Sequence, residues 1–426
     1  DGTGTPYANG AIYPFAANGT LYAQWIFDTS TDGPEWKLYD TDLCTVLGIL
    51  KPIDPTLYLR LNECGSGAIS IPFTDPLALV ITHAQFIGLN YRGAFRGGFF
   101  VEQLNIVDVN SSEYSGRGVK VSGRGMLAIV DDAIVWDWMT PDLENTRFFG
   151  TKNVIGAGSD YPAGGVPVAK GLIVDYLLTE ARDHRINPAG NHLHRFCWHL
   201  AGVEANPYLL TWDFTDVYDS SIPLLTTTWV DTEDMEFRVG TSLLDVIRQV
   251  AALAYDFTID FDIPNCMFVL HAYQVRIGAD LSSTIHFRVG KNCLEVSRQE
   301  LSAELKNSIL VEFSDPTVPY VQVKDNTSIG IYRRKESLLQ ASNASNATTA
   351  TVYGQAELDV TKDPLKNIAI KVSDTVTPNI FIDYNLGDTI SYDKGYGGTE
   401  ETHRVMGAQL SWPGDPLYAD VVVEME

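Results

Sequence analysis

The sequence predicts a mainly β protein with an α/β part, and three observations support this fold class. Aromatic residues make up 11% of the 426 residues, and the chain also holds 35 Gly and 20 Pro. This composition is typical of many short strands joined by tight turns. Several stretches alternate between apolar and polar residues, which is the pattern of antiparallel sheets with one buried face. Few stretches show the period of an amphipathic helix.

The alternating stretches define the predicted strands. The first clear one covers residues 68–73, and two more cover residues 308–313 and 367–372. Residues 380–384 alternate in the same way, and the C-terminal residues 419–426 are also rich in strand-forming side chains. Because alternation gives each run one apolar side, we expect an antiparallel sandwich or barrel.

The best predicted helix begins at Ser242, which is followed by an acidic residue, Asp245, in the arrangement of a helix N-cap. One side of this helix is apolar and comprises Leu243, Leu244, Ile247, Val250, Ala251 and Ala254. From Asp256 onward the pattern changes to that of a strand, in which Phe257, Ile259 and Phe261 alternate with polar residues.

Three further helices are predicted. The longest covers residues 168–183 and ends before Pro188. A short one follows Asp75 and Pro76, because proline suits a first helical turn. Another covers roughly residues 125–130. The polar, low-complexity residues 342–351 predict a loop or linker between strands.

These elements predict three domains, which can be discontinuous in sequence. Residues 1–140 form a β-rich domain, residues 141–285 a mixed α/β inserted domain, and residues 286–426 a second β-rich domain. No tandem repeat is evident in the sequence, but the two β-rich parts are candidates for structural relatives.

The charge balance excludes some functions. The chain has 30 Lys and Arg against 54 Asp and Glu, a formal net charge of −24. Binding that neutralises phosphates needs a surplus of basic residues, so a nucleic-acid or anionic-lipid binder is not expected. No apolar run is long enough to span a membrane. The first residues show no signal peptide, and because they lack an initiator Met we expect a trimmed or processed start.

The cysteines do not form a recognisable framework. There are five, Cys44, Cys64, Cys197, Cys266 and Cys293, which is an odd number with wide spacing and no C-x-x-C motif. We therefore expect buried or incidental thiols in a reducing compartment rather than disulfides.

Half of the histidines lie in one window, which makes it the first candidate metal site. His192 and His194 on a strand would place two imidazoles on one face, and Cys197 and His199 follow closely, with His184 just before. No second motif completes a zinc site, so a histidine cluster in a loop or interface is the favoured interpretation.

Other motifs predict turns rather than chemistry. Residues 28–33 resemble the first half of a calcium loop, but Tyr39 stands where the bidentate glutamate is needed. The glycine-rich residues 64–67 and 122–125 match no phosphate-binding motif and are predicted to be turns. No nucleophile elbow or other catalytic constellation is present. The sequence therefore predicts a protein without catalytic residues or cofactors.

Several stretches, taken in order, form one recognisable series. Those in the first half are residues 61–77, 91–102, 119–130 and 242–262. Those in the second half are residues 294–315, 384–391 with the turn Gly387-Asp388-Thr389, 403–410 and 419–426. Together they resemble hub proteins of phage tails, especially the minor tail proteins of long-tailed phages of Gram-positive hosts. Residues 147–236 depart from the family pattern, so we expect a lineage-specific insertion there.

The resemblance implies two tail-tube-like antiparallel β-barrel or sandwich domains with the α/β domain inserted. It also implies a homotrimer that adapts a sixfold tail tube to a threefold tip, with a channel through which DNA passes without specific binding. The implied partners are a distal tail or tail tube protein, the tape measure protein, and tip or receptor-binding proteins. The implied location is the tail tip of the virion, after assembly in the host cytoplasm.

The net charge adds one expectation, and two alternatives stay open. If the acidic surplus lines the channel, Asp and Glu should outnumber Lys and Arg on its wall. The eight Trp and 20 Tyr keep open a carbohydrate-binding or polysaccharide-degrading β protein. A zinc enzyme built on the histidine cluster is the third possibility.

Overall fold

The structure is a computed structural model of the whole chain. It describes residues 33–110, 115–135, 146–149, 168–182, 210–213, 229, 232–233, 235–251, 255–273, 276–303, 305–313, 319–341, 347–393, 400–413 and 418–425. The described part is mainly β and antiparallel, as the sequence predicted. No described helix is long and apolar enough to cross a membrane.

The largest sheet contains ten strands, eight of which form a continuous antiparallel path in the order β17-β21-β24-β23-β3-β4-β8-β7. The strands from the first part of the chain are β3 (Ile53–Arg60), β4 (Ser66–Pro72), β7 (Gln103–Asn110) and β8 (Ser115–Arg124). Those from the last part are β17 (Glu295–Leu301), β21 (Leu365–Ser373), β23 (Glu400–Ser411) and β24 (Asp420–Met425). The remaining two strands, β16 (His286–Phe287) and β22 (Thr389–Asp393), attach through β23.

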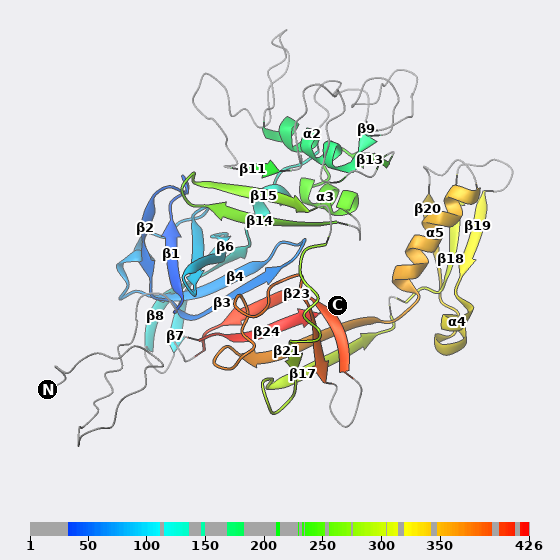
Figure 1. The fold of residues 1–426 in the computed structure, drawn as a ribbon. Helices are drawn as coiled ribbons and strands as arrows, with labels where there is room; N and C mark the ends of the chain where they lie inside the picture. The colour runs from blue at the N-terminus through cyan, green and yellow to red at the C-terminus, as the bar shows by residue number, and fades with distance from the viewer. Residues whose placement is uncertain are drawn as a thin grey trace, which may run out of the picture.

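A four-stranded sheet in the order β2-β1-β5-β6 lies against the first half of the large sheet (Figure 1). Its strands are β1 (Glu35–Tyr39), β2 (Val46–Leu50), β5 (Phe86–Tyr91) and β6 (Ala94–Phe100). The two faces of this sheet contribute side chains to two different hydrophobic cores. Leu89 packs into the core shared with the large sheet, and Phe86 packs into the core on the other side.

That second core lies beneath three helices and a hairpin. The helices are α1 (Ala128–Asp131), α2 (Lys170–Arg182) and α3 (Leu243–Ala251), and the hairpin joins β14 (Asp256–Asp262) to β15 (Met267–Tyr273). Figure 1 shows α2 and α3 above this hairpin. The short strands nearby are β9 (Thr146–Phe149), β10 (Val168–Ala169), β11 (Leu210–Asp213), β12 (Thr232–Glu233) and β13 (Met235–Arg238).

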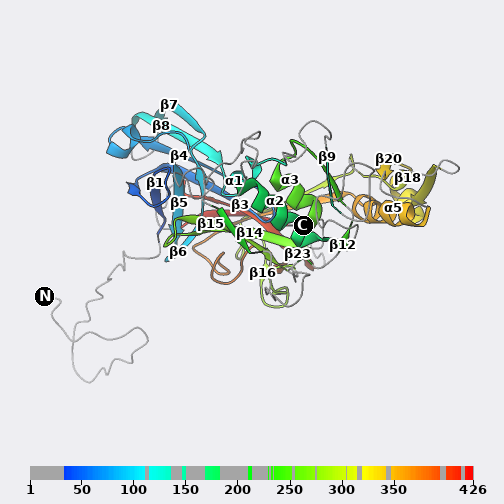
Figure 2. The same cartoon turned by 90° about the horizontal axis from the view of Figure 1, so that it is seen from above.

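Residues 305–361 form a small lobe with its own core. A three-stranded sheet of β18 (Ser308–Phe313), β19 (Tyr320–Lys324) and β20 (Glu336–Ala341) packs one face against α5 (Ala347–Thr361), and α4 (Asn326–Tyr332) follows β19. Figure 2 shows this lobe at one end of the molecule, with β7 and β8 at the opposite end. The linker predicted at residues 342–351 is therefore wrong from Ala347 onward, because its alanines and threonines begin α5.

The helix predictions hold where the structure describes them. Ser242 accepts a hydrogen bond from the Asp245 backbone N–H at 3.1 Å and so caps α3, as predicted. The helix predicted at 168–183 is α2, and the one predicted at 125–130 corresponds to α1. The turn after Asp75 is a 3₁₀-helix, Pro76–Leu79, in which the Asp75 side chain accepts from the Leu77 N–H.

Strand predictions hold for β4, β14, β18, β21 and β24, but the strand predicted at 380–384 is wrong. The Asn379 N–H donates to the Asp383 carboxylate at 2.7 Å, and the Asp383 N–H donates back to the Asn379 carbonyl at 2.9 Å. These bonds close a turn in which only Ile380 and Tyr384 form a bridge.

The turn predicted at residues 122–125 is also wrong, because Ser122, Gly123 and Arg124 end strand β8. A Cβ on Gly123 would lie 1.9 Å from the Phe100 carbonyl oxygen. Glycine is needed here because a neighbouring backbone approaches closely and not because the chain turns.

Candidate functional site

The eight-stranded path is built from two four-stranded units that share one strand order. In the first unit, β3 pairs with β4, β4 with β8, and β8 with β7. In the second unit, β17 pairs with β21, β21 with β24, and β24 with β23. Each unit therefore places its first, second, fourth and third strands side by side. The expected structural relationship between the two β-rich parts is present in this topology.

Within the chain, one pair of strands joins the two units. The third strand of the second unit, β23, pairs with the first strand of the first unit, β3, through Gly407–Arg60 and Gln409–Tyr58 among other pairs. This leaves one free third strand, β7, and one free first strand, β17, at the two ends of the path. No described strand covers the outer edge of either one.

The path has one apolar face and one open face. The apolar face packs into the core shared with the four-stranded sheet and includes Leu57, Ile69, Val121, Ile370, Leu410 and Val423. The register places mostly small, hydroxyl or amide side chains on the open face, such as Ser66, Ala68, Thr56, Gln409, Ser411, Ala369, Ser373, Ser297 and Gln299.

The strand residues on the open face carry both charges. The basic side chains that the register places there are Arg60, Lys120, Arg124 and Lys371, and the acidic ones are Glu295, Asp420 and Glu424. Further carboxylates pair with the two arginines, namely Glu63, Glu102, Asp131 and Asp132.

Arg124 is held in place by acidic neighbours. It donates to Glu102 at 2.8 Å and to Asp131 and Asp132 at 2.7 Å. The hydrogen bond to Glu102 is the main cause that raises the pKa of Arg124 above its ordinary value. Across the sheet, the Tyr58 hydroxyl donates to the Glu424 carboxylate, and burial followed by this bond raises the pKa of Tyr58. These contacts fix charged side chains on the open face.

One edge strand carries an unusually exposed apolar side chain. Ile106 in β7 is 73% exposed, although it lies on the same side of the strand as Leu104, which packs against the core. An exposed edge strand with an apolar side chain is a template for pairing with another chain. This edge is the strongest candidate for an assembly contact.

A buried ion pair ties the β14–β15 hairpin to the large sheet. The Asp256 side chain is 2% exposed and Arg404 of β23 is 14% exposed, and Arg404 donates to the Asp256 carboxylate. Asp256 also accepts from the Asn62 side chain at 2.9 Å and from the Ile277 N–H at 2.7 Å. All of these donors satisfy a carboxylate that would be costly to bury alone.

A second buried cluster joins the four-stranded sheet to the end of β21. Tyr91 donates to Asp374 at 2.6 Å, and Arg92 forms an ion pair with the same carboxylate at 2.9 Å. Burial, followed by the hydrogen bond to Asp374, raises the pKa of Tyr91 to about 12. Both clusters tie separate parts of the fold together. Each oxygen of the Asp256 carboxylate accepts hydrogen bonds, whereas the buried Oδ1 atom of Asp374 accepts none within the part of the chain that the structure describes.

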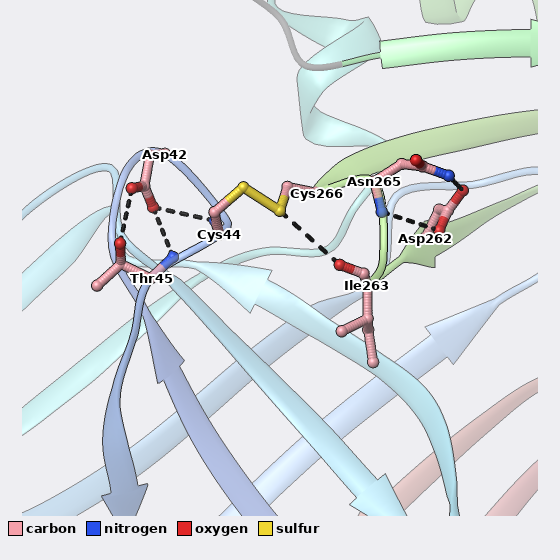
Figure 3. Close-up of a disulfide and its surroundings, with 7 residues drawn as sticks. All are labelled: Asp42, Cys44, Thr45, Asp262, Ile263, Asn265 and Cys266. Carbon is pink, nitrogen blue, oxygen red and sulfur yellow. Dashed lines mark hydrogen bonds between the residues drawn. A yellow bond between two sulfur atoms is a disulfide. The ribbon is translucent and has the colours of Figure 1, made fainter.

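The structure corrects the cysteine prediction, because Cys44 and Cys266 form a disulfide (Figure 3). Cys44 is exposed in the turn between β1 and β2, where the Asp42 carboxylate accepts from the Cys44 N–H at 3.0 Å. Cys266 lies in the turn between β14 and β15, and the two residues are 222 positions apart. Sequence spacing gives no signal for such a distant pair. Cys64 and Cys293 are free, and burial raises the pKa of the Cys64 thiol to about 11.

The predicted metal candidates His192, His194, Cys197 and His199 lie outside the described residues, as does His184. Residues 28–32 of the calcium-like turn also lie outside them. Within the described ranges, no group of three or more His, Cys, Asp or Glu side chains could hold a metal ion. The histidine cluster therefore stays a prediction.

Sequence reasoning missed the edge strand β17 and the strand order that the two units share. The edge strand β17 reads Glu-Val-Ser-Arg-Gln-Glu-Leu, which is too polar to stand out as a strand. The shared strand order was not predicted, because the two units alternate in a similar way but do not share the residues that would mark them as a repeat. A comparison of the patterns around Ile69 and Ile370 could have suggested it.

Comparisons with known proteins support this reading of the fold. No protein-family model and no curated protein matches the chain. A 43 kDa tail protein of prophage MuSo2 from Shewanella oneidensis is similar in structure, with a TM-score of 0.57, 12% identity, and coverage of 92% of this chain and 98% of that chain. The tail protein from Neisseria meningitidis MC58 has a TM-score of 0.55, 10% identity, and coverage of 92% and 96%. The chain thus has the fold of these prophage tail proteins.

Proposed function

We propose that this chain is a structural protein of a phage tail, a homotrimeric hub at the tail tip that surrounds a channel for DNA. The observation that carries the proposal is the sheet of two units with the same strand order and two free ends. The similarity to two prophage tail proteins over nearly their whole length supports the same interpretation.

The strand directions are compatible with a closed ring. The eight strands alternate in direction along the path, so the two end strands run antiparallel to each other. The β7 edge of one copy can therefore meet the β17 edge of the next as an ordinary antiparallel pair. Three copies supply six equivalent units in about 24 strands, which is more than the roughly 16–18 strands at which closed barrels already leave an aqueous channel. Closure also removes both exposed edges.

In this ring the open face of the sheet lines the channel, since the apolar face is covered by the chain itself. The wall is then rich in small uncharged side chains, and several carboxylates pair with its arginines. The acidic wall expected from the net charge stays a prediction. DNA adheres to surfaces that offer unpaired cations. Arg124 is surrounded by Glu102, Asp131 and Asp132, and Arg60 by Glu63, so these cations are already compensated.

The partners in this proposal follow from its location in the virion. One end of the ring contacts a distal tail or tail tube protein and the tape measure protein, and the other end anchors tip or receptor-binding proteins. Assembly takes place in the host cytoplasm. The proposed role is non-enzymatic and needs no cofactor.

The carbohydrate-binding alternative gains no support from the described tryptophans. Trp36, Trp229 and Trp412 are all buried, so none of them offers a face for stacking on a sugar ring.

Electron microscopy of the purified full-length protein tests the proposal. We expect rings with threefold symmetry, six similar lobes and a central channel, and a native mass of three 47.0 kDa chains. A solitary particle without a channel at all protein concentrations would contradict it.

A further inference from the structure

We infer that strand β7 of one copy pairs with strand β17 of a second copy in a defined register, with Asn105 opposite Gln299. This inference rests on the proposed ring and specifies its contact. It follows from treating the contact between β23 and β3 inside the chain as the template for the contact between chains.

The two units can be matched residue by residue from the ends of their strands. The first strands end at Arg60 and Leu301, and the second strands end at Pro72 and Ser373. The pairing inside each unit agrees with this match, because Tyr58 faces Ser66 just as Gln299 faces Asn367.

Hydrogen bonds beyond the strand ends agree as well. The Phe73 N–H donates to the Arg117 carbonyl, and the equivalent Asp374 N–H donates to the Ala419 carbonyl. In the third and fourth strands, Asn105 faces Lys120 just as Gln409 faces Val422.

The internal contact can then be transferred to the free edges. Inside the chain, Gln409 of β23 lies opposite Tyr58 of β3. Asn105 is the equivalent of Gln409, and Gln299 is the equivalent of Tyr58, so these two residues should face each other between copies. By the same rule Ile106 lies beside Arg298 of the second copy, whose aliphatic stem covers the exposed isoleucine.

The geometry of closed barrels agrees with this register. The row of paired residues that starts at Tyr58 passes through Gln409, Val422 and Lys371 and reaches β17 at Glu295. The residue equivalent to Tyr58 is Gln299, so each four-stranded unit shifts the register by about four residues. A stagger of about one residue per strand tilts the strands by about 35°, which lies in the range that closed barrels adopt.

The backbone hydrogen bonds of the internal contact predict which residue pairs between copies exchange backbone hydrogen bonds and which do not. In the internal contact the Leu61 N–H donates to the Met406 carbonyl, and the Trp412 N–H donates to the Pro55 carbonyl. Gln409 and Tyr58 therefore form a non-hydrogen-bonded pair, as do Asn105 and Gln299. The Cα atoms of such a pair lie about 4.5 Å apart, which suits a disulfide.

Cysteine cross-linking of the full-length protein tests the register. The variant with both Asn105→Cys and Gln299→Cys is oxidised with oxidised glutathione and run on non-reducing gels. The two positions lie on strands seven spacings apart in one chain, about 34 Å, so only separate copies can be joined. We expect covalent dimers and trimers in at least about tenfold excess over either single variant.

The matched control is the variant with Asn105→Cys and Ser297→Cys, which keeps the same face but shifts the register by two residues. Two results would overturn the register and leave the trimer intact. One is stronger cross-linking in this control than in the Asn105→Cys and Gln299→Cys variant, and the other is no cross-linking in either variant while the native mass stays trimeric. A monomeric native mass without cross-links would overturn both the register and the proposed ring.

Discussion

The two four-stranded units of the large sheet share a strand order but differ in how their first two strands are connected. In the first unit a short turn of residues 61–65 joins β3 to β4, whereas in the second unit residues 302–364 between β17 and β21 include the whole small lobe. The pairing of the two strands is nevertheless equivalent. The sheet is therefore the common framework, and the lobe is an addition to it.

The units also differ in which edge is covered. The contact between β23 and β3 joins the units within the chain, while the equivalent edges at β7 and β17 have no described partner. Equivalent residues at the internal contact and at the two free edges can therefore be compared directly by substitution.

The largest effect is expected from Ile106→Pro in β7. In the inferred register the Ile106 N–H points to the neighbouring copy, so proline removes an intermolecular hydrogen bond and leaves the pairing with β8 intact. We expect the concentration at which the trimer dissociates to rise by about 10- to 100-fold, measured by sedimentation velocity.

Ile106→Ala is the matched control, because it keeps the N–H and removes only the exposed side chain. It should weaken the trimer far less than proline does. Equal trimer stability for Ile106→Pro and the natural chain would show that this edge is not the contact.

The next largest effect is expected from loss of the disulfide, which joins the β14–β15 hairpin to the turn between β1 and β2. Cys44→Ser opens a loop of 222 residues, which in the loop-entropy account lowers the free energy of unfolding by about 5 kcal/mol. Urea denaturation measures this loss. Reduction of the natural chain should reproduce it, and Cys293→Ser, which removes a free thiol, should not.

A smaller loss is expected from Arg404→Ala, next to the internal contact. It leaves the buried Asp256 carboxylate without its cation and should lower the free energy of unfolding by about 3–5 kcal/mol. Arg288→Ala breaks an exposed pair with Glu400 and serves as the control, with little change expected. Similar urea midpoints for both variants would contradict a structural role for the Asp256 cluster.

The smallest effect is expected from removing the lobe. Replacing residues 302–364 with a short turn like residues 61–65 should leave the sheet and the trimer unchanged, because the lobe has its own core of Ile309, Val311 and Leu358. Circular dichroism and native mass check this outcome. A deletion variant that cannot fold would show that the lobe is part of the framework.

Local patterns predicted much of the fold. Alternation identified β4, β18, β21 and β24, and the capping residue Ser242 identified the start of α3. These signals are local, since one buried face or one cap leaves its mark on a few neighbouring residues.

Long-range features could not be predicted in this way. The disulfide between Cys44 and Cys266 and the contact of β23 with β3 join residues hundreds of positions apart. Local pattern also misled at residues 380–384, where hydrogen bonds between Asn379 and Asp383 close a turn. The edge strand β17 was missed because its sequence is mostly polar, with Val296 as its only apolar residue before Leu301.

Hydrogen exchange of the backbone amides in β7 and β17 tests the central claim most directly. If three copies close the sheet through these edges, the outward amides of Leu104 and Ile106 should become as protected as those of β3 and β23 when the protein concentration is raised. Exchange at these two amides that stays fast at every concentration, while β3 and β23 are protected, would contradict the account.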